Sequence, residues 1–96
     1  MLVQVSKEDI DNGIRCEEAS CPIAHAINRA TGKRSLVSDS LDIMLYDDGS
    51  TTYEEATHFV EIPKDKQEVI DNFIMDFDNC NPVEPFEFEC EIKEFE

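Results

Sequence analysis

The sequence predicts one small α+β domain over residues 1–96, with an antiparallel or mixed sheet of four to five strands and two helices packed on one face. Residues 86–93 alternate strictly between apolar and charged side chains, which is typical of a half-buried strand. Residues 63–77 and 22–31 repeat apolar side chains every three or four positions, which is typical of amphipathic helices. A chain of this length can bury about 60% of its unfolded surface, which suffices for one core.

The N-terminal segment predicts a strand followed by a short helix. Residues 1–5 are mostly apolar and favour a strand. Ser6 is the expected N-cap, with Asp9 three residues later as in a capping box. We expect the helix to end at residues 12–13, where glycine would adopt a left-handed conformation. Residues 14–20 are expected to be irregular.

A second helix is expected to begin at Pro22, because a missing N–H costs nothing in a first helical turn. Ser20 is the expected N-cap and Gly32 the expected end. The apolar stripe of this helix is narrow and consists of Ile23, Ala24, Ile27 and Ala30. Basic side chains gather at its C-terminal end, where we interpret them as complementing the helix dipole: Arg29, Lys33 and Arg34.

The middle of the chain predicts short strands. Residues 36–37 and 41–46 are strand candidates, and residues 47–49 form a strong turn signal. Residues 51–53 are the expected return strand of a hairpin, and residues 58–62 are a further short apolar run.

The last helix is expected to begin at Pro63 and to end within residues 79–82. Its apolar face consists of Val69, Ile70, Phe73, Ile74 and Phe77. In the strand that follows, the side chains expected to face the core are Phe86, Phe88, Cys90 and Ile92. The opposite face of that strand carries Glu87, Glu89 and Glu91.

The charge balance is the feature that most constrains function. The chain has 23 Asp and Glu against 8 Lys and Arg, a formal net charge of -15. Such a charge destabilises a small fold by self-repulsion, so solubility alone explains it poorly. The six Phe and the apolar content of 41% argue against a disordered acidic tail. We therefore expect the protein to avoid nucleic acid and anionic membranes and to bind a basic surface.

The sequence also bears on the compartment. No stretch approaches the roughly 20 apolar residues that span a bilayer. The first residues lack the basic and apolar regions of a signal peptide. We expect a cytoplasmic protein whose four cysteines are reduced thiols.

Two segments resemble parts of small uncharacterised phage and prophage proteins. Residues 8–24 carry the pattern EDI..G..C....CPIA, which resembles the opening of those proteins, and residues 77–88 carry FD...PVEPFEF, which resembles their close. The two segments lie toward the ends of the chain and cover well under half of it. The resemblance implies a phage or mobile-element origin, and it brings no catalytic residue and no ligand.

Cys16, Cys21 and His25 form the candidate metal set. Zinc needs four ligands, so Cys80, Cys90 or His58 would have to complete it. The alternatives are that the cysteines are small core residues, or that Cys16 and Cys21 form a local disulfide. The loose C-x4-C spacing favours the core interpretation, so we expect no metal and no cofactor.

The sequence contains no recognised catalytic motif. It has no GxSxG, Walker loop, GxGxxG or HExxH. With so many Asp and Glu, paired carboxylates arise by chance and indicate no active site. We expect a non-enzymatic protein.

The acidic rows give the functional hypothesis. Same-face residues of a strand lie about 6.6 Å apart, similar to neighbouring phosphates on one DNA strand. We expect an inhibitor of a nucleic-acid-handling host system, an anti-CRISPR or anti-restriction protein, that acts as a DNA mimic on a basic host surface. The expected contact residues are Glu87, Glu89 and Glu91, with a second row of Asp71, Asp76 and Asp78. The alternatives are a structural or accessory phage protein whose acidity only keeps it soluble, and a small metal-binding module.

Overall fold

The computed structural model describes residues 1–15, 17, 19–37, 43–46 and 56–94. Its radius of gyration is 12.3 Å, and its principal extents are 38 × 25 × 21 Å. The α+β class is confirmed. In chain order the elements are β1 (Leu2–Val5), α1 (Lys7–Asn12), α2 (Pro22–Thr31), β2 (Arg34–Val37), β3 (Ile43–Tyr46), β4 (His58–Glu61), α3 (Lys64–Asp78), β5 (Phe86–Glu89) and β6 (Glu91–Glu94).

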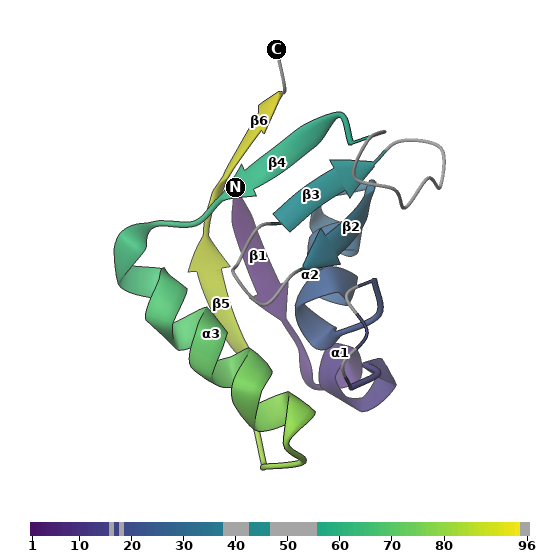
Figure 1. Ribbon diagram of the computed structural model, residues 1–96, viewed down its shortest axis with the longest axis vertical. Coiled ribbons are helices and arrows are strands. Elements are labelled where there is room, and N and C mark those ends of the chain that lie inside the picture. Colours follow the sequence, from purple (N-terminus) through teal and green to yellow (C-terminus); the bar gives the residue numbers. More distant parts are fainter. Residues whose placement is uncertain (16, 18, 38–42, 47–55, 95–96) are drawn as a thin grey trace.

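The described strands form two antiparallel sheets where one was expected. β1 pairs with β5 in a two-stranded sheet, and the other four are ordered β2-β3-β4-β6. α2 lies beside β1, and α3 lies beside β5, on opposite flanks of the β1–β5 ribbon (Figure 1). The structure therefore has three described helices, and the two long ones do not share one side of a single sheet.

The predicted strand over residues 86–93 passes from one sheet to the other at Cys90. The backbone N–H of Cys90 donates to the carbonyl of Met1 at 2.9 Å, which continues the pairing with β1. From Glu91 onward the partner is β4, with Ile92 opposite Val60. Exposure still alternates along the segment, with Phe88 2% and Cys90 3% exposed between exposed neighbours. The predicted alternation is confirmed, although the strand changes its partner.

The short helix α1 begins as predicted. The hydroxyl of Ser6 accepts from the backbone N–H of Asp9, and the Asp9 carboxylate accepts from the backbone N–H of Ser6, which completes a capping box. The predicted left-handed exit is wrong, because Gly13 has φ -71° and ψ 148°. The glycine is needed for space instead, since a Cβ at this position would lie 2.6 Å from the ring of Pro22.

The helix α2 begins at Pro22 as expected, but its N-cap differs from the prediction. Its N-cap is Cys21, whose Sγ accepts from the backbone N–H of Ala24 at 3.4 Å, and Ser20 does not cap it. Pro22 occupies the first turn as predicted, and Gly32 ends the helix in the left-handed region at φ 73°. The expected stripe is buried except for Ala30, which is exposed.

Aromatic side chains fix α3 against β5. The rings of Phe73 and Phe86 lie 5.0 Å apart, and those of Phe86 and Phe88 lie 5.9 Å apart. Ile70, Phe73 and Phe77 are buried, whereas Val69, which was expected on the same face, is 46% exposed. Val69 lies about 100° around the helix from Ile70, outside the buried stripe.

One hydrophobic cluster joins both sheets to α2 and α3, with its fully buried members Val3, Ile23, Ala24, Ile27, Leu45 and Ile70. The predicted strand over 36–37 corresponds to β2, and the run over 58–62 corresponds to β4. Of the strand predicted over 41–46, residues 43–46 form β3. Residues 41–42, the predicted turn at 47–49 and the predicted return strand at 51–53 lie outside the described residues.

Candidate functional site

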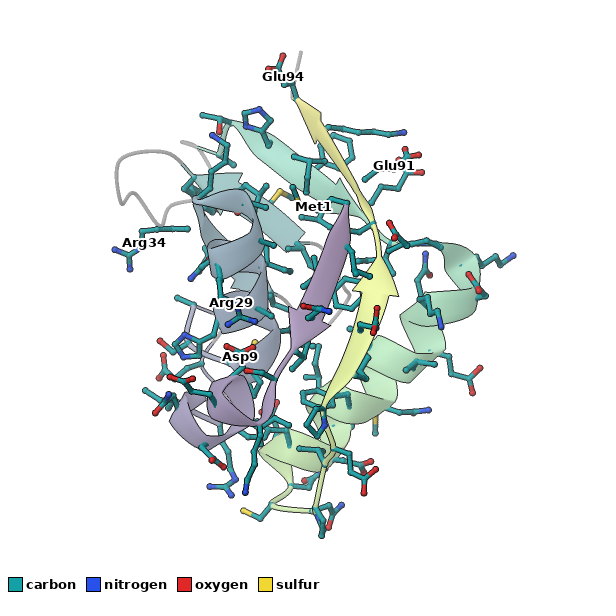
Figure 2. The ribbon with its side chains drawn as sticks, turned by 180° about the vertical axis from the view of Figure 1, so that it is seen from behind. Met1, Asp9, Arg29, Arg34, Glu91 and Glu94 are labelled. Atoms are coloured by element: carbon teal, nitrogen blue, oxygen red, sulfur yellow. The ribbon has the colours of Figure 1, made fainter. Side chains whose placement is uncertain are left out.

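The candidate surface is the row of Glu87, Glu89 and Glu91, called here the Glu row. All three side chains are exposed. Gln4 and Leu2, the register partners of Glu87 and Glu89 on β1, are exposed as well. Successive side chains of a strand point to opposite faces, so this face lies away from the phenylalanines that contact α3. The Glu row therefore borders an open face of the β1–β5 sheet, turned toward the viewer in Figure 2.

Two members of the Glu row have cations nearby. Glu89 Oε2 lies 3.5 Å from the α-amino group of Met1. Lys93 Nζ lies 2.5 Å from Glu61 Oε2 and 3.7 Å from Glu91 Oε2. Among the described residues, Glu87 is the member of the row without an ion pair. Its carboxylate is therefore the least compensated charge on this face.

Lys93 bridges a pair of like charges. Glu61 on β4 is the register partner of Glu91 on β6. Like charges directly opposite each other destabilise a sheet. The hydrogen bond to Glu61, together with the charges of Glu61 and Glu91, raises the pKa of Lys93. The lysine thus offsets repulsion within the acidic edge of the four-stranded sheet.

The second expected row, Asp71, Asp76 and Asp78, does not form on α3. Asp71 and Asp78 line one surface hollow of about 320 Å³ together with Ile74, Met75 and Asn79. Asp76 lies about 160° around the helix from Asp78. Its Oδ1 accepts from the side-chain amide of Asn81 at 3.5 Å. The three carboxylates are therefore divided between two flanks of the helix.

The Glu row and the α3 aspartates also lie on different sides of the molecule. The contact between Phe73 and Phe86 places α3 on the phenylalanine face of β5. Glu87 and Glu89 point from the opposite face. Figure 2 shows β5 in front of α3 in this view. One flat partner surface cannot contact both sets, so the Glu row remains as the single candidate surface of the two.

An ion pair between a buried aspartate and a half-exposed arginine connects α1, α2 and β1. The guanidinium of Arg29 donates to Asp9 Oδ1 at 2.6 Å and to Asp9 Oδ2 at 2.8 Å (Figure 2). It also donates to the carbonyl of Gln4 at 2.6 Å. Burial acts to raise the pKa of Asp9, but hydrogen bonds from Arg29 and Ser6 outweigh it and hold the pKa below its ordinary value.

This ion pair corrects the interpretation of the basic cluster. Arg29 serves a buried carboxylate and a strand carbonyl, so the helix dipole is not its main partner. Arg34 points away from Arg29, and its side chain is exposed (Figure 2). Three basic residues that are close in sequence therefore do not form one cationic site.

The metal candidates are only partly described. Cys16 lies outside the described residues. Cys21 is a buried free thiol, and burial raises its pKa, which disfavours the thiolate that would bind a metal. His25 Nε2 is buried without a hydrogen-bond partner in the described part of the chain. No three or more His, Cys, Asp or Glu side chains gather into a metal-binding group among the described residues.

Arg15 is a further polar residue whose role the sequence did not indicate. Its Nε donates to the carbonyl of Phe77 at 3.2 Å, and its guanidinium carbon lies 5.6 Å from the centre of the Phe77 ring. The contact serves a carbonyl at the C-terminal end of α3, where helices leave acceptors unpaired. The side chain borders a hollow of about 460 Å³ that also contacts Asp11 and Cys80.

Comparison with protein-family models, with curated proteins and with solved structures yields no match to this chain. Among the described residues, no helix is both long and apolar enough to cross a membrane.

Proposed function

We propose that the protein is a non-enzymatic, phage-type inhibitor that binds a basic surface on a host nucleic-acid-handling system, either a CRISPR complex or a restriction enzyme, as a DNA mimic in the host cytoplasm. The observation that supports the proposal is the exposed Glu row on an open sheet face. A net charge of -15 would draw such a face toward clustered Lys and Arg.

We limit the proposed contact surface to the Glu row. The α3 aspartates lie on another side of the molecule, so they contribute to the overall field and not to the same contact. The Glu row occupies rigid strands whose opposite face is packed into the core. A rigid display of charge costs little ordering on binding.

A second candidate function is a structural or accessory phage protein whose acidity only keeps it soluble. The nearby cations favour it, because Met1 and Lys93 partly neutralise Glu89 and Glu91. In that case the Glu row has no partner, and reversing its charges changes solubility alone.

The test is capture of purified CRISPR effector complexes and restriction enzymes on the immobilised protein at rising salt. We expect capture to weaken steeply between 50 and 500 mM NaCl, because charges more than about 8–10 Å apart are screened at physiological salt. Duplex DNA should compete with the protein, because both would need the same Lys and Arg groups.

The matched variants are two triple reversals. Glu87→Lys with Glu89→Lys and Glu91→Lys should abolish capture. The control carries the same change in net charge at exposed positions elsewhere: Asp11→Lys, Glu17→Lys and Glu68→Lys. The control should retain most of the capture. Equal loss in both variants would show that only net charge matters, and full retention in both would remove the Glu row from the mechanism.

A further inference from the structure

The backbone of β5 has groups that point away from its partner strand. Met1 and Cys90 exchange two hydrogen bonds, with Met1 N donating at 2.8 Å and Cys90 N donating at 2.9 Å. In an antiparallel pair, such doubly bonded positions alternate with positions that make no bond to the partner. The register pairs Glu89 with Leu2 and places it next to the doubly bonded pair. The N–H and C=O groups of Glu87 and Glu89 therefore point to the outer edge of β5.

No described strand pairs with this outer edge. β1 is the one described strand that pairs with β5, and β1 and β4 both lie on the same side of the β5–β6 segment (Figure 1). By the register, the ladder bonds to β1 come from Phe86 and Phe88, and the backbone groups of Glu87 and Glu89 take part in none of the turn, loop or cap hydrogen bonds of the described residues. A row of unpaired N–H and C=O groups at a sheet edge is a template for an added strand. The edge thus offers two donors and two acceptors in strand register.

The charges at the edge determine which strand can be added. Pairing with a second copy through the same edge would bring the carboxylates of Glu87 and Glu89 close to their own counterparts, and like charges on paired strands are destabilising. A net charge of -15 on each copy adds to that repulsion. A strand with Lys or Arg at every second position would instead place a cation beside each of the two carboxylates.

We propose that the outer edge of β5 binds an extended basic segment of a partner protein as an added strand, with Lys or Arg at alternate positions facing Glu87 and Glu89. Main-chain bonds would give the register, and the alternate side chains would give the selectivity. The inference rests on the proposed function and deepens it, because it makes the basic contact of the partner an extended chain.

The experiment uses a synthetic nine-residue peptide of alternating Lys and Val, with amide hydrogen exchange of the protein followed by NMR. We expect the amides of Glu87 and Glu89 to exchange at least tenfold more slowly when the peptide is bound. The amides of Phe86 and Phe88 already bond to β1, so their exchange should be slow with and without the peptide. Binding without new protection at Glu87 and Glu89 would overturn the proposal.

Two N-methylated forms of the peptide separate main-chain pairing from charge. One carries the methyl groups on the Lys residues and the other on the Val residues, so both retain every charge. The N–H groups of alternate residues point to opposite edges of a strand, so only one form loses the donors that face β5. That form should bind about fivefold more weakly for each lost bond, and the other should bind like the parent peptide. Equal affinity of the two forms would overturn edge pairing.

A pair of protein variants tests the same edge. Glu89→Gln removes one charge, whereas Glu89→Pro removes the charge and the outward N–H without removing a bond to β1. Glu89→Pro should weaken peptide binding several-fold more than Glu89→Gln does. The amide hydrogen exchange of Phe86 and Phe88 should be unchanged in both variants. If the peptide binds both variants equally while wild-type protein still captures host complexes in the salt series, edge pairing fails and the proposed function stands. The protein could instead form dimers whose amount rises with concentration and in which the amides of Glu87 and Glu89 are protected. That result would show that a second copy of the protein binds this edge, and it would overturn the proposal.

Discussion

Arg29 on α2 holds both carboxylate oxygens of Asp9 on α1, at 2.6 Å and 2.8 Å, across a sequence separation of 20 residues. The two partners differ in burial, because the side chain of Asp9 is 5% exposed and that of Arg29 is 54% exposed. Asp9 also completes the capping box of α1 through Ser6. A single carboxylate therefore caps the start of α1 and connects α1 to α2.

The hydrogen bonds that the Asp9 carboxylate accepts from Arg29 and Ser6 make the stability of the fold sensitive to acid. Its pKa is lowered in the folded protein, so its contribution to stability is complete above the unfolded value of about 3.8 and is lost as pH falls toward the folded value. Asp9→Asn should cost roughly 1–3 kcal/mol at pH 7. The difference between wild type and this variant should shrink below about pH 4. Urea melts at pH 7, 4 and 3 measure it.

Arg29→Ala provides the matched comparison for that prediction. It leaves a buried carboxylate without its cation, whereas Asp9→Ala leaves a half-exposed guanidinium that water can solvate. Arg29→Ala should therefore be at least as destabilised as Asp9→Ala at pH 7. Arg29→Ala should recover part of its lost stability, relative to wild type, when Asp9 is protonated. A difference between wild type and Asp9→Asn that is independent of pH would contradict the assignment of this pair.

The sequence predicted individual elements better than it predicted their partners. Alternation over residues 86–93 identified the exposed and buried side chains, because burial follows the pleat whichever strand lies alongside. The same alternation does not reveal the change of sheet at Cys90, because the segment keeps its two-residue period when its partner changes from β1 to β4. The capping box at Ser6 was local and was found, but its link to Arg29 depends on how α1 and α2 pack.

The candidate site shows the same difference between local features, which the sequence predicts, and long-range contacts, which it does not. The exposure of Glu87 and Glu89 followed from local pattern. The division of the α3 aspartates was already readable from helix geometry, because Asp76 and Asp78 differ by two residues and so lie about 160° apart. The ion pair between Lys93 and Glu61 could not be predicted, because the two residues are far apart in the sequence and only the fold brings them together.

The two described glycines at helix ends should respond differently to substitution. Gly32 has φ 73° and open space around it, so Gly32→Ala should cost roughly 1–2 kcal/mol by backbone strain, and Gly32→Asn should cost less. Gly13 has an extended backbone, and a Cβ there would meet the Pro22 ring at 2.6 Å. Gly13→Ala and Gly13→Asn should therefore both cost roughly 1–3 kcal/mol. Denaturant melts that show rescue by Asn at both positions would exclude the steric role of Gly13.

Phe88 should be the most sensitive position of the C-terminal segment. It is 2% exposed and lies against Phe86 in the cluster that fixes α3. Phe88→Ala should lower the free energy of unfolding by roughly 3–5 kcal/mol, enough to unfold a marginal domain. Glu87→Gln, one residue earlier on the opposite face, should be nearly silent in the same thermal and urea melts. Small and equal effects at the two positions would show that this strand does not face the core.

Lys93 offers a variant in which stability and binding should change in opposite directions. Its ammonium offsets repulsion between Glu61 and Glu91, so Lys93→Gln should lower the urea midpoint slightly, and the loss should diminish in high salt. The same change frees two carboxylates on the acidic edge, so capture of a basic partner at low salt should become tighter. Glu94→Gln is the control, because it removes one exposed charge from the same strand and should weaken capture slightly. If acidity served solubility alone, Lys93→Gln would change the melts and leave capture as it was; tighter capture by a less stable protein is the outcome that an acidic binding surface requires.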